Sequence, residues 1–389
     1  MAAPSRRVAV LGGGSLGLLV AAALARPTGR IARQVVLLTR TPVVPAGATA
    51  AELLAPAEIT VEDRCTSAAP GAAPAAAASW TAPVHVPVRP RQASDALPPL
   101  DALLVATKHY DAVRAVQGAH AWLTPGRTAL VPLANGLGLE EQLRTAFPAQ
   151  PLVLATTTYG AARRGPLRVA HTGVGTVYVG PAGGGRAAHA AAEGVLNDFV
   201  DAGLHGVWDP NMPRRLWTKA AVSACLNGPA AVLNVHNGAL ASPAATPLLR
   251  AICEDVAAVM AHAGVGPVDA AQLFREAHEV QSSRPREPCV ARRDGLTNGT
   301  GEPRAGGTLT QVAVRTAPNI NSMLQDVRAG RPTEVGAIYG YIVQQAAKHG
   351  VATPRLQLLH DLVRLREACG PSDGPVLDVL PPPPTAPAA

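Results

Sequence analysis

One lysine and two short polar residues follow each other at four-residue steps in an alanine-rich segment. The stretch LWTKAAVSACLN places Lys219, Ser223 and Asn227 at i, i+4 and i+8, a spacing that puts side chains on one face of a helix, and a helix is predicted over 214–226. Lysine is rare, with three in 389 residues. A lysine in a partly apolar pocket can act as a general acid, because desolvation lowers its pKa. The alternative is a solvent-exposed stripe, for which this composition would sooner supply arginine or glutamate.

A serine and a glutamate stand close together in a later segment. Ser322 and Glu334 lie twelve residues apart in NSMLQDVRAGRPTEVGAIYGY. Glu334 opens a predicted amphipathic helix over 333–349, where a first-turn acid also interacts favourably with the helix dipole. That structural role remains an alternative to a role in binding.

A glycine pattern near the N-terminus indicates a nucleotide site. GGGSLG supplies Gly12, Gly14 and Gly17 between a buried strand, RVAVLG, and an apolar helix. The first glycine permits the tight turn, the second lets the backbone approach a pyrophosphate, and the third lets helix and strand pack closely. Ser15 and Leu16 begin the helix whose free N–H groups would bind the anion. A glycine turn without ligand is the alternative.

The ends of the neighbouring predicted strands carry three more polar candidates. The second strand ends LLTRTP, with Arg40 and no acid, which favours a 2′-phosphate and hence NADP(H) over NAD. Lys108 ends the strand DALLVATK, and Asn135 follows the next strand in a glycine turn. An amide there can orient a nicotinamide or a substrate hydroxyl, or simply cap the turn. Arg40 is otherwise one more arginine of an arginine-rich chain.

Elements able to position these residues alternate between strand and helix in the first half of the chain. Apolar runs predict strands over 7–12, 34–40, 56–63, 82–90, 101–108, 152–162 and 175–182, a strand running into a glycine turn over 128–138, and helices over 15–26 and 111–123. From about residue 208 the signals are helical, over 214–226, 244–264, 267–279, 333–349 and 354–369. The pattern predicts an α/β Rossmann-type domain over 1–209, an all-helical domain over 210–370 and a disordered tail over 371–389.

Composition narrows the function classes. The net charge is +7, but there is no long basic run with interleaved aromatics, which argues against nucleic acid. The five cysteines form no CxxC pair, so we expect free thiols and no metal cluster. We find no apolar run long enough for a membrane span and no signal peptide, and expect a cytoplasmic protein. Low-complexity or polar insertions are expected near 66–82 and 282–307.

Taken together, these segments resemble the ketopantoate reductase family. The resemblance runs through nearly the whole chain, in VAVLGGGSLG, LLVATKHYDAV, LANGLGLEEQL, TTTYGAARRGPLRVAHTGVGTVYVGPA, RLWTKAAVSACLNGPAAVLNVHNGAL and SMLQDVRAGRPTEVGAIYGYIV. The last two are far more specific than the glycine turn. The resemblance implies a Rossmann domain, a helical domain, and NADPH-dependent reduction of 2-dehydropantoate to (R)-pantoate for pantothenate and coenzyme A synthesis.

The resemblance also implies residue roles. Lys219 would protonate the C2 alkoxide, and Glu334 would hold the substrate hydroxyl. The remaining implied contacts are Ser322 near the carboxylate, Asn135 and Asn227 orienting substrate and nicotinamide, Ser223 in the substrate site, Lys108 in the cofactor pocket, and Arg40 at the 2′-phosphate. A lysine suits the acid role, because arginine stays charged at any ordinary pH.

Two departures bear on the substrate. The family usually has an asparagine at the position of Ser223. It also usually has an aspartate two residues after the glutamate, where this chain has Gly336. These departures motivate one alternative, a reductase of another 2-oxo acid or ketone. The other alternative is a non-catalytic NADPH-binding regulator, which would be marked by loss of Lys219 or Glu334, and both are present. The expected partner is a small anionic 2-oxo acid, and the expected assembly is a monomer or homodimer.

Overall fold

The contacts of the chain divide it into two compact units. The computed structural model describes residues 6–26, 33–40, 54–64, 78–87, 95, 98–275, 320–371 and 374–376. Within these residues, the first unit runs to Ala134 and resumes over Leu139–Met212. The second unit takes the short turn Asn135–Gly138 and the chain from Pro213 onward.

Four buried parallel strands form the centre of the first unit. The strands are β1 (Arg6–Leu11), β2 (Arg33–Leu38), β5 (Ala102–Val105) and β6 (Ala129–Pro132), in the spatial order β6-β5-β1-β2. Alternate residues of β1 enter opposite cores, with Val8 and Val10 on one face and Ala9 and Leu11 on the other. Burial on both faces explains why these strands are continuous apolar runs.

The sheet continues beyond β2 with antiparallel pairs. It adds β4 (Ala78–Pro87), β3 (Leu54–Asp63), β9 (Arg168–Gly173) and β8 (Gly160–Gly165) in that order. The predicted strand over 56–63 is confirmed, as is the strand over 82–90 up to Pro87, where the described residues end, and most of the predicted insertion over 66–82 also lies outside the described residues. A second, three-stranded sheet holds β7 (Val153–Thr157), β10 (Val177–Pro181) and β11 (Gly206–Trp208).

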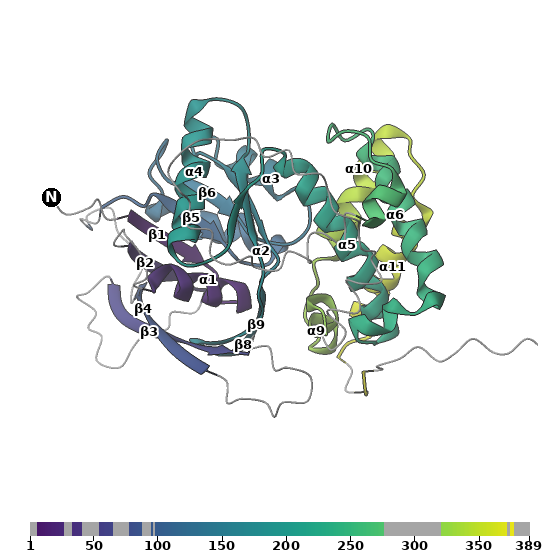
Figure 1. Cartoon of the computed structure of the whole chain (residues 1–389), viewed down its shortest axis with the longest axis horizontal. Coiled ribbons are helices and arrows are strands. Elements are labelled where there is room, and N and C mark those ends of the chain that lie inside the picture. The colour runs from purple at the N-terminus through teal and green to yellow at the C-terminus, as the bar shows by residue number, and fades with distance from the viewer. Residues whose placement is uncertain are drawn as a thin grey trace, which may run out of the picture. The chain divides into compact units, whose positions relative to one another are not determined.

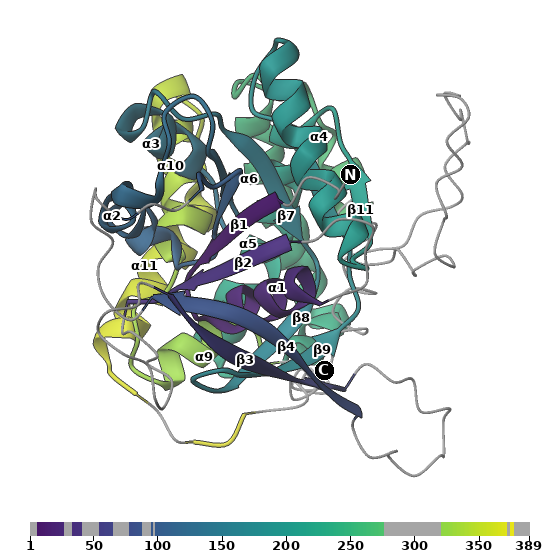
Figure 2. The same ribbon diagram turned by 90° about the vertical axis from the view of Figure 1, so that its left-hand side faces the viewer.

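Helices cover both faces of the parallel strands. The helix α1 (Ser15–Ala25) packs into the core that holds Val8, while α2 (His109–Gly118) and α3 (Leu139–Ala146) pack into the core that holds Ala9. Figure 2 shows α1 on one side of the strands and α2 and α3 on the other. This arrangement confirms the Rossmann-type α/β domain.

The helix α4 (Arg186–Asp201) is absent from the predicted elements. It packs its apolar face, including Val195 and Phe199, beside α1 in the same core. A buried carboxylate joins it to the sheet, because Asp198 pairs with Arg6 at 2.7 Å and Arg33 at 3.2 Å. These partners are more than 160 residues away in the chain, so no local sequence pattern predicts the ion pairs.

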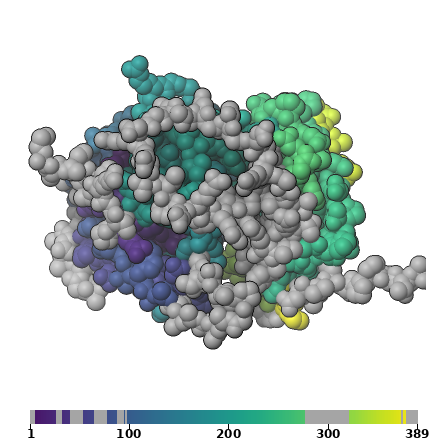
Figure 3. Space-filling view, in the orientation of Figure 1, coloured from purple at the N-terminus to yellow at the C-terminus, as the bar shows by residue number. Residues whose placement is uncertain are grey.

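The second unit is helical, as predicted (Figure 1). Figure 3 shows its green α6 region and its yellow C-terminal helix at the surface. A buried carboxylate fixes the start of that last helix, because Asp255 accepts hydrogen bonds from the N–H groups of Arg355 and Leu356. The elements are α5 (Met212–Leu233), α6 (Thr246–Met260), α9 (Ser322–Arg328), the π-helical turn η4 (Gly336–Gly340), α10 (Tyr341–His349) and α11 (Pro354–Ala368).

The predicted helix end at residue 226 is wrong. The helix α5 continues to Leu233 and contains Pro229. Proline inside a helix normally removes a hydrogen bond and kinks the chain. Here the hydroxyl of Tyr339 supplies bonds to α5 beside the proline, accepting from the Gly228 N–H and donating to the Ala224 carbonyl.

Four other predictions need adjustment or lie outside the described residues. The run over 152–162 divides into β7 and β8, and the run over 333–349 becomes helical only from Val335, beginning with a π-turn. The insertion over 282–307 and nearly all of the tail lie outside the described residues. Within the described ranges, no helix is both long and apolar enough to cross a membrane.

Candidate active site

The three polar residues of α5 share one partly exposed seam of a buried helix. Between Trp217 and Ala231, every residue is buried except Lys219, Ser223 and Asn227. Their spacing of four residues places them about 6 Å apart along the axis. The seam confirms the predicted common face, and its surroundings are core rather than a solvated helix surface.

Burial changes the acidity of Lys219. Desolvation lowers its pKa from 10.5 to about 8, and the negative charge of Glu334 opposes that shift. A lysine with a pKa near 8 is largely protonated at neutral pH and can release its proton to a developing alkoxide. This is the property that the isolated lysine of LWTKAAVSACLN led us to expect.

Glu334 is a buried carboxylate, with 6% of its surface exposed. It stands just before η4, and its side chain accepts a hydrogen bond from Asn135, whose Nδ2 lies 3.3 Å from Oε2. The structure therefore joins three predicted site residues, with Glu334 acting on Lys219 and bound to Asn135.

The turn that carries Asn135 packs directly on the segment after Glu334. Leu137 N donates to the Ala337 carbonyl at 3.0 Å. Gly136 has φ +90°, and a Cβ there would overlap Ala337, while a Cβ at Gly138 would lie 2.5 Å from the Tyr341 ring. Both glycines are thus required for close approach, and the Asn135 side chain bonds to Glu334.

Ser322 and Gly336 lie at the margins of this cluster. Ser322 is exposed at the first residue of α9. Its neighbour Asn321 caps α9 and donates to Asn237 at 2.9 Å and to the Leu226 carbonyl at 3.5 Å, next to Asn227. A Cβ at the exposed Gly336 would meet nothing within 4 Å, so an acidic side chain would fit there without strain.

The glycine turn of the first unit has the geometry expected for a dinucleotide site. Gly12 has φ +121°, and a Cβ there would lie 2.7 Å from the Ala106 carbonyl oxygen. A Cβ at Gly17 would overlap the Gly12 carbonyl oxygen. Gly14 is different, because its φ is −76° and its nearest contact would be 3.9 Å away. Because Gly14 has no side chain, a ligand could approach the backbone on that open side of the turn.

The start of α1 fits an anion. Gly14 is the N-cap, no side chain caps the helix, and no acid stands in its first turn. Ser15 accepts a hydrogen bond from Arg163 N at 3.0 Å, and Leu16 packs against the core. The buried hydroxyl oxygen of Thr107, two residues after β5, has no hydrogen-bond partner, so it is open to a polar ligand at this edge.

Arg40 and Lys108 flank the same edge of the sheet. Lys108 is the N-cap residue of α2, after β5. Arg40 follows β2, exposes 75% of its side chain and pairs with Asp111, which also pairs with Arg114. Two guanidinium groups around one carboxylate leave a net positive cluster, which suits a phosphate at the end of β2.

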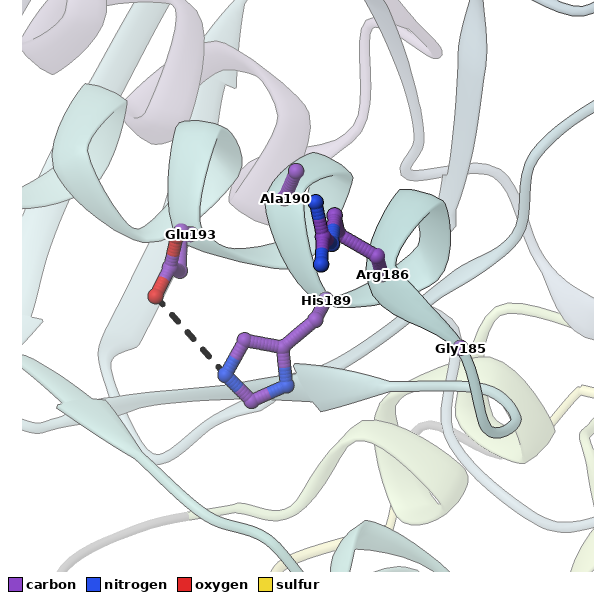
Figure 4. A pocket seen from close by; sticks show the side chains of 5 residues that line it. All are labelled: Gly185, Arg186, His189, Ala190 and Glu193. Atoms are coloured by element: carbon purple, nitrogen blue, oxygen red, sulfur yellow. Dashed lines mark ion pairs between the residues drawn. The ribbon is translucent and has the colours of Figure 1, made fainter.

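A surface hollow on α4 contains none of these residues. It is lined by Gly185, Arg186, His189, Ala190 and Glu193 (Figure 4). His189 lies 3.7 Å from Glu193 and packs on Trp208. Its polar side chains are exposed, and its histidine and glutamate already pair with each other, so we assign it no function. In the described part of the chain, no group of three His, Cys, Asp or Glu side chains could hold a metal ion.

Two family descriptions match the sequence in succession. Residues 8–184 match the ketopantoate reductase PanE/ApbA family, and residues 211–367 match the C-terminal part of the same family. The chain belongs to the ketopantoate reductase family. The resemblance read from the motifs is therefore confirmed.

Relatives of this family extend over most of the chain. The 2-dehydropantoate 2-reductase of Vibrio cholerae is 32% identical over 273 residues, which is 70% of this chain and 80% of the relative. The 2-dehydropantoate 2-reductase of the archaeon Halobacterium salinarum is 32% identical over 272 residues, covering 69% and 77%. Similarity at this level in both a bacterium and an archaeon supports the family assignment independently.

Solved structures share the fold of this ketopantoate reductase family member. The 2-dehydropantoate 2-reductase of Methylococcus capsulatus matches with a TM-score of 0.67 and 21% identity, over 93% of this chain and 97% of the other. A D-mandelate dehydrogenase solved with NADH and anilino(oxo)acetate matches with a TM-score of 0.69 and 20% identity, over 93% and 98%. At these identities the likeness concerns the fold.

Four polar residues that contribute to these clusters were not predicted from the sequence. Thr107 and Asp111 stand beside the predicted Lys108, and Asn321 stands beside Ser322. Each lies within three residues of a predicted site residue, and that proximity in the sequence is the signal that could have identified it. Tyr339 had no such signal, because its hydroxyl acts on a helix that lies 111 residues away in the chain.

Proposed function

We propose that this protein is an NADPH-dependent 2-dehydropantoate 2-reductase, which reduces ketopantoate to (R)-pantoate. The observation that carries the proposal is the charge of the buried Glu334 carboxylate acting on Lys219, whose pKa is lowered by desolvation to about 8. The names of the relatives support the substrate. The product suits a role in pantothenate and coenzyme A synthesis.

Lys219 is the general acid in this proposal. Hydride addition to C2 of a 2-oxo acid leaves an alkoxide, and the Lys219 ammonium stabilises that charge and then protonates the oxygen. Glu334 accepts a hydrogen bond from the substrate hydroxyl, while Asn135 holds the Glu334 carboxylate in place. Ser223, Asn227 and Ser322 supply further polar contacts to the substrate.

The first unit binds the cofactor, which supplies the hydride when bound. Gly12, Gly14 and Gly17 form the turn, and the N–H groups at Ser15 and Leu16 bind the pyrophosphate at the start of α1. Lys108 and Thr107 contact the cofactor beyond the end of β5. Arg40 binds the 2′-phosphate, because no acid stands at the end of β2 to accept a ribose hydroxyl.

An absorbance assay tests the proposed reaction. Purified protein should oxidise NADPH with ketopantoate at a higher kcat/KM than with other 2-oxo acids, including those with an aryl group. A better aryl or longer-chain 2-oxo acid would overturn the substrate while keeping the reaction class. The shorter Ser223 side chain is the feature that would accommodate such a substrate. Binding of NADPH without turnover of any 2-oxo acid would overturn the enzyme assignment in favour of a regulator.

Replacing Arg40 tests the cofactor preference. Arg40→Ala should weaken NADPH binding by roughly tenfold to a hundredfold, the range for losing hydrogen bonds to a charged group. NADH binding should change by less than twofold, because NADH has no 2′-phosphate. Titration of both cofactors by fluorescence measures the two dissociation constants.

Arg127→Ala is the matched control for Arg40. Arg127 is also an exposed, ion-paired arginine, with 56% of its side chain exposed, but it precedes β6 at the opposite edge of the sheet. Its loss should leave both affinities unchanged. Equal weakening of NADH and NADPH in Arg40→Ala would contradict the 2′-phosphate role.

A further inference from the structure

The side chain of Tyr339 is inserted into the helix that carries Lys219. Its hydroxyl accepts a hydrogen bond from Gly228 N at 3.1 Å and donates one to the Ala224 carbonyl. These are the two groups, four residues apart, that an uninterrupted α-helix joins directly. Insertion of a side chain into this ladder is a recognised cause of local helix distortion.

The sequence of α5 is adapted to this insertion. A Cβ at Gly228 would overlap the Tyr339 hydroxyl oxygen and lie 2.7 Å from the ring carbon that bears it. Glycine is therefore required for the phenol to approach. The next residue, Pro229, has no N–H to donate, so the helix lacks a backbone hydrogen bond there, and the phenol contacts the backbone at the residue before it.

The two bridged groups adjoin two residues of the polar seam. Ala224 follows Ser223 directly, and Gly228 follows Asn227. Tyr339 itself lies in the π-helical turn that begins two residues after Glu334. One buried hydroxyl thus connects the backbone beside Ser223 and Asn227 to the segment that carries the carboxylate.

Tyr339 does not contact substrate, because none of its surface is exposed. Burial also raises the pKa of its phenol well above the usual value, so the hydroxyl stays neutral and keeps its donor proton. A buried tyrosine hydroxyl needs hydrogen-bond partners, and here both partners are backbone groups of α5. The residue is therefore suited to positioning and not to proton transfer.

We propose that Tyr339 is a positioning residue that fixes the register of Ser223 and Asn227 against Glu334. The inference rests on the proposed function, because those residues are the proposed substrate contacts. Without the hydroxyl, Gly228 N and the Ala224 carbonyl each lose a side-chain partner, which changes the hydrogen bonding of the helix beside Asn227. A misplacement of about 1 Å at a reacting group can cost roughly a hundredfold in rate.

The conservative variant Tyr339→Phe tests this role. We expect kcat/KM for ketopantoate to fall roughly tenfold to a hundredfold, with NADPH affinity within twofold of wild type. Tyr178→Phe is the control, because Tyr178 is another buried tyrosine, in β10 of the first unit. If Tyr339 served only stability, both variants would lower the melting temperature and neither would change kcat/KM, and the proposal would be overturned.

A second variant tests the fit between the phenol and Gly228. Gly228→Ala should lower kcat/KM more than Tyr339→Phe does, because the new methyl group overlaps the hydroxyl. The double variant removes that overlap and leaves the ring carbon at 2.7 Å, so it should recover part of the loss. Losses that simply multiply in the double variant would show that the two positions act independently, against the proposal.

Hydrogen exchange separates this inference from the proposed reaction. Amides of α5 around Gly228 should exchange at a different rate in Tyr339→Phe than in Tyr178→Phe, whatever the substrate is. An unchanged rate would overturn the positioning role even in an active enzyme. If wild-type protein reduces no 2-oxo acid but the two variants still differ in exchange rate, the proposed reaction is overturned and the contact between Tyr339 and α5 stands.

Discussion

Lys219→Ala is expected to lower kcat for ketopantoate reduction by about 10³-fold, within the range attributed to general acid catalysis. The residual hydride transfer would leave an alkoxide that only water can protonate. NADPH affinity should remain within a few-fold of wild type, because the proposed cofactor contacts lie in the first unit. Stopped-flow and steady-state measurements of NADPH absorbance, with a separate binding titration, measure both quantities.

Two further lysine variants sharpen this test. Lys219→Arg keeps the positive charge but has a pKa above about 12, so it should be nearly as inactive as the alanine variant. Lys348→Ala is the matched control, since Lys348 is an exposed lysine near the end of α10. A Lys219→Arg enzyme with near wild-type kcat would contradict proton donation and indicate that charge alone suffices.

Glu334→Gln is expected to lower kcat/KM for ketopantoate by about a hundredfold, which corresponds to losing a strong charged hydrogen bond. It should also displace the alkaline limb of the pH profile. The acid must be protonated, so activity falls as pH rises through the Lys219 pKa of about 8. Glu334 raises that pKa, and removing its charge lowers it. The limb should therefore move to lower pH.

A pH–rate profile of kcat/KM between pH 6 and about 10 measures this displacement. Glu254→Gln is a suitable control, because Glu254 is an exposed glutamate on α6 with 58% of its side chain exposed. It should change neither the rate nor the limb. A Glu334→Gln limb at the wild-type position, or at higher pH, would show that Glu334 does not act on the proton donor.

Local patterns were sufficient for the elements of the nucleotide domain. The four central strands are buried on both faces, so each appears in the sequence as an apolar run. Gly12 and Gly17 are demanded by the turn between β1 and α1, because Gly12 has φ +121° and a Cβ at Gly17 would overlap the Gly12 carbonyl oxygen, and that strand–turn–helix unit is contiguous in the chain. The seam of Lys219, Ser223 and Asn227 was equally visible, because helical spacing alone decides which residues share a face.

Elements held by distant partners were not predictable in the same way. The helix α4 has an alanine-rich start and no side-chain N-cap, so its local signal is weak. Its attachment depends on Asp198 meeting Arg6 and Arg33 from the other end of the unit. The continuation of α5 through Pro229 is a similar case. Proline is a local signal for a helix end, and the contact of Tyr339 with the helix beside it comes from a distant segment of the chain.

The sequence by itself determined the family, the fold class and the chemical types of the site residues, because these depend on periodicity and on short contiguous motifs. Tertiary structure decided what those residues do to one another. It brought Asn135 to Glu334 across 199 positions of the chain and buried Lys219 enough to lower its pKa to about 8. Burial and charge proximity are properties of packing, and packing between distant segments leaves no local pattern in the sequence.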